Sequence, residues 1–209
     1  MTFWHRRGLE NGVETFVVGV ELVSALRESE AGFLDIVQKV RAVYSGRVTY
    51  SANWDERPSD TVWRAMDEVS VQFYPPLTNV DAVPDDVLRR TARRHLAAWV
   101  ATADRVGKPL VLSEVGYLAS PIAWRRPWEW PKRLPLHQQV EDQKQQERGC
   151  RALFSALASE PKVKGVYIWK YFSDPKTRIE VENGFTPRGK PAELILCEAF
   201  GGACGARSP

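Results

Sequence analysis

Short apolar segments alternate with amphipathic segments along almost the whole chain, and this alternation restricts its fold more than any other feature. The segments expected to be strands are residues 16–20, 47–52, 68–74, 110–113 and 163–169. The segments expected to be helices are residues 31–44, 61–66, 85–106, 136–159 and 190–200. Strands that alternate with helices in this way are typical of an α/β fold with a parallel sheet.

The spacing of these segments favours a (β/α)8 barrel. Such a barrel has about 31 residues per βα unit, and three units fit between Glu21, after the first strand, and Glu114, at the end of the fourth. In a barrel, both carboxylates would lie at the mouth, where the C-terminal strand ends converge, roughly facing each other. Two carboxylates on such a face are the groups that glycoside hydrolysis requires. The spacing suggests this arrangement without deciding it.

The composition is that of an ordinary globular protein and argues against two classes of partner. The chain has 209 residues, of which 44% are hydrophobic and 26% charged, and this is enough to form one domain with a substantial core. The net charge is only +3 and the basic residues are scattered, so we expect no nucleic-acid partner. No apolar run approaches the roughly 20 residues that span a bilayer, so we expect no membrane partner.

The sequence shows no motif for a metal or another cofactor. It has no phosphate-binding glycine-rich loop and no cluster with metal-ligand spacing, so we expect no cofactor. The three cysteines, Cys150, Cys197 and Cys204, could form one disulfide at most, and the sequence favours free thiols.

A tryptophan-rich segment at residues 119–132 is broken by prolines and is expected to be a loop. It carries Trp124, Trp128 and Trp130. Their rings could stack on sugar faces, or they could anchor the loop against the rest of the protein. The sequence leaves both uses open.

Six segments, in order along the chain, resemble glycoside hydrolase family 113, a family of retaining, β-mannanase-like TIM-barrel enzymes. These segments are Val-Gly-Val-Glu21-Leu, Tyr50–Glu56, Val71–Leu77, Gly107–Tyr117, Gly165–Trp169 and Gly184–Ala192. The resemblance extends from about residue 3 to about residue 195. It implies a partial (β/α)8 TIM barrel of about five βα units, equivalent to strands 4 to 8, without the N-terminal strands.

The resemblance also implies roles for particular residues. Glu21, after strand 4, matches the acid/base of the family, and Glu114, at the end of strand 7, matches its nucleophile. The residues expected to bind substrate are Asn53, Trp54, Tyr74 and Trp169, with Trp124 and Trp128 added from the loop. Tyr74 would hydrogen-bond the nucleophile or nearby sugar hydroxyls. Trp169 would form the floor under the sugar at the cleavage point.

Each role has a plainer alternative. Glu114 could merely accept hydrogen bonds from neighbouring strand ends, and Tyr74 could be a core residue. Glu21 follows Val20, whereas many members of the wider superfamily carry Asn before the acid/base. Asp55 and Glu56 are expected to lie in a solvated loop or to cap a helix.

The function that the resemblance implies is a retaining glycoside hydrolase that cleaves β-linked, mannan-like glycans by a double displacement with two glutamates. Its partner would be an oligo- or polysaccharide. The alternative is a truncated, non-catalytic remnant that binds carbohydrate. A barrel from an unrelated enzyme class is a further possibility, because one fold supports many chemistries.

We expect residues 1–200 to form the partial barrel domain and residues 201–209 to form a flexible tail. Three explanations for the absent strands stay open: a misplaced start, a truncated gene, or completion of the barrel by another copy or chain. The start lacks a signal-peptide core, but the genuine start could lie upstream, so the sequence leaves the localisation unknown.

Overall fold

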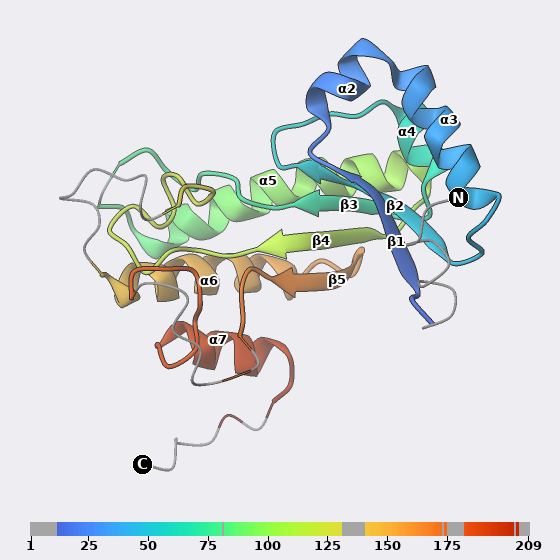
Figure 1. Cartoon of the computed structure of the whole chain (residues 1–209). Coiled ribbons are helices and arrows are strands. Elements are labelled where there is room, and N and C mark those ends of the chain that lie inside the picture. The colour runs from blue at the N-terminus through green and yellow to red at the C-terminus, as the bar shows by residue number, and fades with distance from the viewer. Residues whose placement is uncertain are drawn as a thin grey trace. The chain divides into compact units, whose positions relative to one another are not determined.

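The computed structural model describes residues 12–80, 82–130, 141–172, 174, 182–202 and 204 (Figure 1). Its central feature is a five-stranded parallel sheet in which strands that follow each other in sequence are neighbours. The strands are β1 (Thr15–Val20), β2 (Arg47–Asn53), β3 (Val69–Gln72), β4 (Leu110–Val115) and β5 (Val163–Ile168). The expected α/β class and all five expected strands are therefore confirmed.

The register of the sheet is defined for its first three strands. Thr15 of β1 lies opposite Arg47 of β2, and the register shifts between Val17 and Gly19. The residues of β3 are all buried, and so is most of β2, as is usual for strands of a parallel sheet that are covered on both faces. By contrast, β1 is at most half-buried throughout.

Helices follow the strands, as the alternation predicts. They are α2 (Val23–Glu28), α3 (Glu30–Arg41), α4 (Asp60–Ala65), α5 (Asp85–Val106), α6 (Gln143–Leu157) and α7 (Ala192–Ala199). Short polar side chains cap the start of three of them, because Ser29, Ser59 and Asp142 each accept a backbone N–H of the first turn. The sequence did not predict α2, and residues 136–140 of the helix expected at residues 136–159 lie outside the described residues. None of the described helices combines the length and apolar character needed to cross a bilayer.

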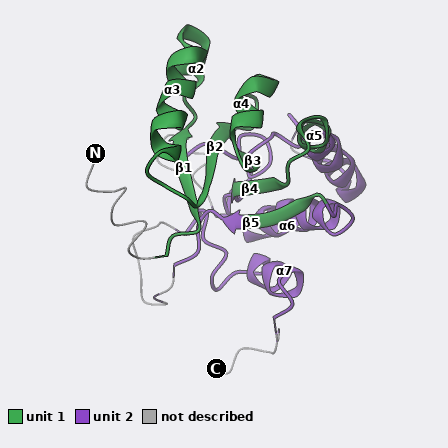
Figure 2. Ribbon diagram, turned by 90° about the vertical axis from the view of Figure 1, so that its right-hand side faces the viewer, with its two compact units in different colours: residues 1–73, 98–113, 162–166 green, residues 74–97, 114–161, 167–209 purple. Residues whose placement is uncertain are grey.

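The chain forms two compact units, coloured separately in Figure 2. Unit 1 comprises residues 1–73, 98–113 and 162–166, and unit 2 comprises residues 74–97, 114–161 and 167–209. Aromatic side chains build the core of unit 1. Tyr50 and Trp63 are fully buried, and the Trp63 ring meets Trp99 edge to face, with ring centroids 6.2 Å apart. Edge-to-face pairs of this kind add to the stabilisation from burial alone.

A buried amide organises the core of unit 2. The side-chain amide of Gln146, on α6, donates hydrogen bonds to the carbonyl oxygens of Tyr117 and Phe185, each 2.9 Å away. These bonds fasten the segment after β4 and the segment before α7 to the same helix. Buried polar groups with partners of this kind hold loops in one arrangement.

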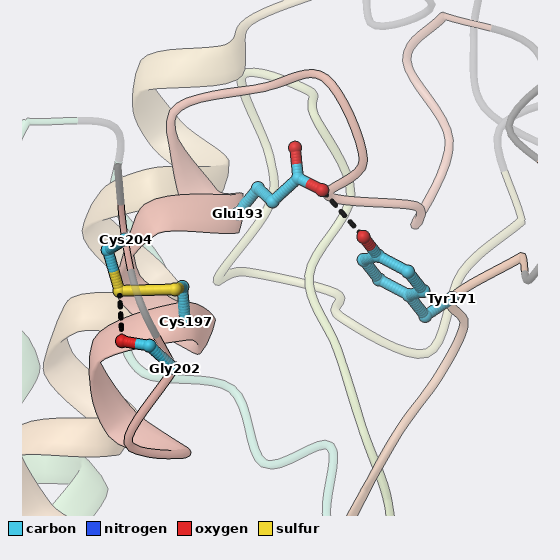
Figure 3. Close-up of a disulfide and its surroundings, with 5 residues drawn as sticks. All are labelled: Tyr171, Glu193, Cys197, Gly202 and Cys204. Atoms are coloured by element: carbon cyan, nitrogen blue, oxygen red, sulfur yellow. Dashed lines mark hydrogen bonds between the residues drawn. A yellow bond between two sulfur atoms is a disulfide. The ribbon is translucent and has the colours of Figure 1, made fainter. Parts of the chain in front are cut away.

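The expectation of free thiols was wrong for two of the three cysteines. Cys197, on α7, and Cys204 form a disulfide, with Cα atoms 5.8 Å apart (Figure 3). The chain reverses direction between them, since Gly201 takes a positive φ of 68° and Gly202 donates its N–H to the carbonyl of Cys197. Cys150 is free and buried. The disulfide thus ties Cys204, in the expected flexible tail, to α7.

Candidate active site

Glu21 lies directly after β1, in unit 1, in an unusual backbone conformation. Its φ is 49°, and among the described residues it is the only non-glycine residue with a positive φ. Its N–H donates to the carbonyl of Ser51 on β2, at 2.9 Å. A side chain in this left-handed region is unfavourable and persists where surrounding contacts impose it, which is common at functional sites.

Negative groups surround the Glu21 carboxyl. Although the residue as a whole is exposed, partial burial of its carboxyl raises the pKa, and the nearby Glu56 and Asp55 raise it further. A carboxyl whose pKa is raised keeps its proton at higher pH than an ordinary glutamate. It is therefore suited to donate a proton to a leaving group.

Glu56 corrects one expectation from the sequence. It does not lie in a solvated loop, because it is only 8% exposed and both of its carboxyl oxygens are 2.8 Å from the hydroxyl of Tyr50. Its neighbour Asp55 is exposed, as expected. The adjacent residues Asp55 and Glu56 are therefore one solvated and one buried carboxylate.

Asn53 and Trp54, the expected cleft residues of unit 1, follow one another at the end of β2, and both are half-buried. The N–H of Asn53 donates to Glu56 at 3.1 Å. The carbonyl of Trp54 accepts hydrogen bonds from the indole of Trp99 and the guanidinium of Arg57. These bonds hold the backbone at the end of the strand.

Glu114, in β4, belongs to unit 2 and has a hydrogen-bond donor beside it. The hydroxyl of Tyr74, which follows β3, donates to Oε2 of Glu114 at 3.0 Å. Tyr74 is buried, and its ring meets Phe185 edge to face at 6.3 Å. A hydroxyl that donates to a carboxylate stabilises its charged form and fixes its orientation. A charged, oriented carboxylate is suited to act as a nucleophile.

Trp169 lies close to the backbone that carries Glu114. Its N–H donates to the carbonyl of Val115 at 2.7 Å. The neighbouring Gly116 allows this approach, because a Cβ atom there would lie 2.0 Å from the carbonyl oxygen of Trp169. The peptide bond between Trp169 and Lys170 is cis.

The three loop tryptophans differ from one another in unit 2. Trp124 is fully buried and its ring lies 4.8 Å from the guanidinium carbon of Arg148, which favours the anchoring role over stacking on sugar. Trp128 is 42% exposed. Trp130, 40% exposed, contacts Trp169 edge to face at 6.3 Å.

The sequence does not predict the hydrogen bonds between Tyr50 and Glu56 or the contact between Trp130 and Trp169. Both Tyr50 and Glu56 lie inside one of the segments that carry the family resemblance, which is the signal that points to them. Trp130 was seen in the loop, but its contact with Trp169 depends on the path of that loop. Within the described part of the chain, no three His, Cys, Asp or Glu side chains are grouped so as to hold a metal ion.

Comparison with known families identifies the chain. The model of Glycoside Hydrolase Family 113 matches residues 6–190, so the chain belongs to this family. Among proteins of curated function, none matches the sequence at a significant level.

Solved structures of the same family are similar over nearly the whole chain. The GH113 β-mannanase AaManA from Alicyclobacillus acidocaldarius, solved in complex with ManMIm, has 26% identity and a TM-score of 0.75, with 97% of this chain and 59% of that chain covered. A GH113 β-1,4-mannanase has 24% identity and a TM-score of 0.76, with coverages of 95% and 59%. A β-glucuronidase from Bifidobacterium dentium is more distant, with 16% identity, a TM-score of 0.55 and coverages of 84% and 27%. The chain thus spans about three-fifths of the length of the family structures that it matches.

Proposed function

We propose that the protein is a retaining glycoside hydrolase that cleaves β-linked glycans, of the β-mannan class, by double displacement. Glu114 attacks the anomeric carbon and forms a covalent glycosyl-enzyme, while Glu21 protonates the departing oxygen. Water then attacks the anomeric carbon, the bond to Glu114 breaks and frees its carboxylate, and Glu21 takes the proton from that water. This proposal extends the family membership to a substrate and to two catalytic groups.

The observation that carries the proposal is the contrast between the two carboxyls. Glu114 lies within β4 and Glu21 directly follows β1, and both strands belong to one parallel sheet. Burial and the neighbouring Glu56 raise the pKa of Glu21, which suits a proton donor. The hydroxyl of Tyr74 donates to Glu114, which suits a charged nucleophile. A double displacement needs one carboxyl of each kind.

Aromatic side chains support a sugar site beside Glu114. Trp169 is held next to Val115, and the exposed ring of Trp130 packs against it. Flat apolar rings bind the axial C–H face of a sugar, and they attract the positive charge that develops in the transition state. We propose that Trp169, Trp130 and Trp128 bind the glycan in unit 2, and that Asn53 and Trp54 do so in unit 1.

The stereochemistry of the product tests the proposal. Proton NMR during hydrolysis of β-1,4-mannan oligosaccharides should show the β-anomer of the new reducing end first, followed by slow mutarotation. The α-anomer appearing first would contradict a double displacement, since inversion needs a different arrangement of the carboxyls.

A second function, carbohydrate binding without hydrolysis, is favoured by a separate observation. Trp128 and Trp130 are both exposed, and exposed rings can bind glycan whether or not catalysis follows. Calorimetry with mannan oligosaccharides separates the two. Binding without any released product would support the second function, and binding with turnover would support the first.

A further inference from the structure

Glu56 is a buried carboxylate that the proposed reaction does not use directly. It follows β2 in unit 1, and its two oxygens lie at equal distances of 2.8 Å from the hydroxyl of Tyr50. Its Oε2 also accepts the N–H of Asn53 at 3.1 Å. The pKa of Glu56 is raised, chiefly by burial and also by Asp55, although these two hydrogen bonds partly oppose the rise by stabilising its charged form. The side chain is therefore held firmly in one place.

The hydroxyl of Tyr50 connects Glu56 to the turn that carries Glu21. While it donates to Glu56, it accepts the N–H of Leu22 at 2.7 Å. The preceding N–H, that of Glu21, is bonded to the carbonyl of Ser51. Two consecutive N–H groups of this turn are thus attached to β2, and this attachment explains how Glu21 is kept at its positive φ.

The charged groups around Glu21 differ in how strongly they act. Asp55 is exposed, and water screens its charge. Arg57 directs its Nη1 to the carbonyl oxygens of Trp54 and Glu56. The charged residues of α2, Arg27 and Glu28, lie in its last turn. The fixed and buried charge of Glu56 is consequently the one best placed to influence the Glu21 carboxyl.

We propose that Glu56, held by the Tyr50 hydroxyl, is a positioning residue that keeps the Glu21 carboxyl oriented and in its proton-donating form. This role rests on the proposed function, in which Glu21 is the acid/base. Glu56 need not touch the substrate. It acts through its negative charge and through the link that Tyr50 makes to the turn.

Direct titration of Glu21 in the intact chain tests the electrostatic part of this role. Carbon-13 NMR of glutamate-labelled protein reports each side-chain carboxyl, and Glu21→Gln assigns the signal. Glu56→Gln keeps the shape of the side chain and removes its charge, so the pKa of Glu21 should fall by about half a unit or more. Glu68→Gln is the matched control: Glu68 is also buried in unit 1, but it pairs with Arg47 and should leave the Glu21 titration unchanged.

A second variant keeps the test decisive if Glu56→Gln does not fold. Tyr50→Phe removes the hydroxyl that stabilises the charge on Glu56, so Glu56 keeps its proton to higher pH and repels Glu21 less. The pKa of Glu21 should again fall. A Glu21 titration that is the same in wild type and in the folded variant would overturn the proposal.

The pH dependence of turnover connects the titration to function. Glu21 must be protonated for the first step, so kcat/KM falls as pH rises through its pKa. In Glu56→Gln this basic limb should move to lower pH by the same amount as the NMR titration, and an unmoved limb would contradict the role. A wild-type chain without turnover contradicts the proposed function, whereas an unchanged titration contradicts the positioning role alone. The two failures are therefore distinguishable.

Discussion

The surroundings of Glu21 and of Glu114 differ in whether they disfavour or favour a negative charge on a carboxyl group. In unit 1, Glu21 has partial burial and two acidic neighbours, Glu56 and Asp55, and all three raise its pKa. In unit 2, Glu114 receives a hydrogen bond from the hydroxyl of Tyr74. These different surroundings fit the proposed function, in which Glu21 is the acid and Glu114 the nucleophile. If the proposed roles hold, the environment rather than the residue type distinguishes the two glutamates.

The largest expected effect comes from exchanging each carboxyl for an amide. Glu114→Gln removes the proposed nucleophile and should lower kcat by roughly 10⁴-fold or more on every substrate. Glu21→Gln removes the proposed acid, so this variant should be severely impaired on mannan. It should be much less impaired in forming the glycosyl-enzyme from an aryl mannoside, whose leaving group needs no proton. Burst kinetics with a dinitrophenyl mannoside measure this difference. Equal losses in both variants on both substrates would remove the distinction between the two roles.

A smaller effect is expected from the group that supports the nucleophile. Tyr74→Phe removes the hydroxyl that donates to Glu114, and kcat/KM should fall about 10- to 100-fold, because a hydrogen bond to a charged group is lost. The fold should persist, since the ring that packs against Phe185 is kept. Steady-state kinetics and thermal unfolding give both results. An unchanged kcat/KM would show that this contact does not serve Glu114 in catalysis.

The smallest effects on activity are expected for two tryptophans of the loop, and these two should differ in whether stability or glycan binding changes. Trp124→Ala empties a fully buried site and should lower the free energy of unfolding by about 3–5 kcal/mol. Trp128→Ala changes an exposed ring, so the unfolding free energy should stay nearly constant while glycan binding weakens by roughly 1 kcal/mol. Urea denaturation and calorimetry measure the two quantities. A stable Trp124→Ala protein with weakened glycan binding would reverse these assignments.

Most of the fold could be predicted because apolar periodicity is local. The alternation of strands and helices depends on residues within one segment, and α5 begins and ends at the predicted residues 85 and 106. The candidate carboxylates could be found for the same reason, since Glu21 and Glu114 mark strand ends. Only α2 went unrecognised among the described helices, and it is one of the shortest.

The site features that were missed depend on the path of turns and loops, which apolar periodicity does not describe. Glu56 stands beside Asp55 and looks solvated in the sequence, but the hydroxyl of Tyr50 and the N–H of Asn53 make its burial possible. The disulfide between Cys197 and Cys204 depends on the reversal of the chain at Gly201. Similarly, the burial of Trp124 and the exposure of Trp128 depend on the path of one loop. Such features become visible only when the fold brings the groups together.

Trapping of the covalent intermediate tests the central claim most directly. A 2-fluoro-β-mannosyl donor with an activated leaving group forms the glycosyl-enzyme, and the fluorine slows its hydrolysis. We predict that intact-mass spectrometry shows one added fluoromannosyl group, located by peptide mapping on Glu114 and absent from the Glu114→Gln variant. An adduct on another residue, or turnover of mannan with no adduct at all, would contradict the assignment of Glu114 as the nucleophile.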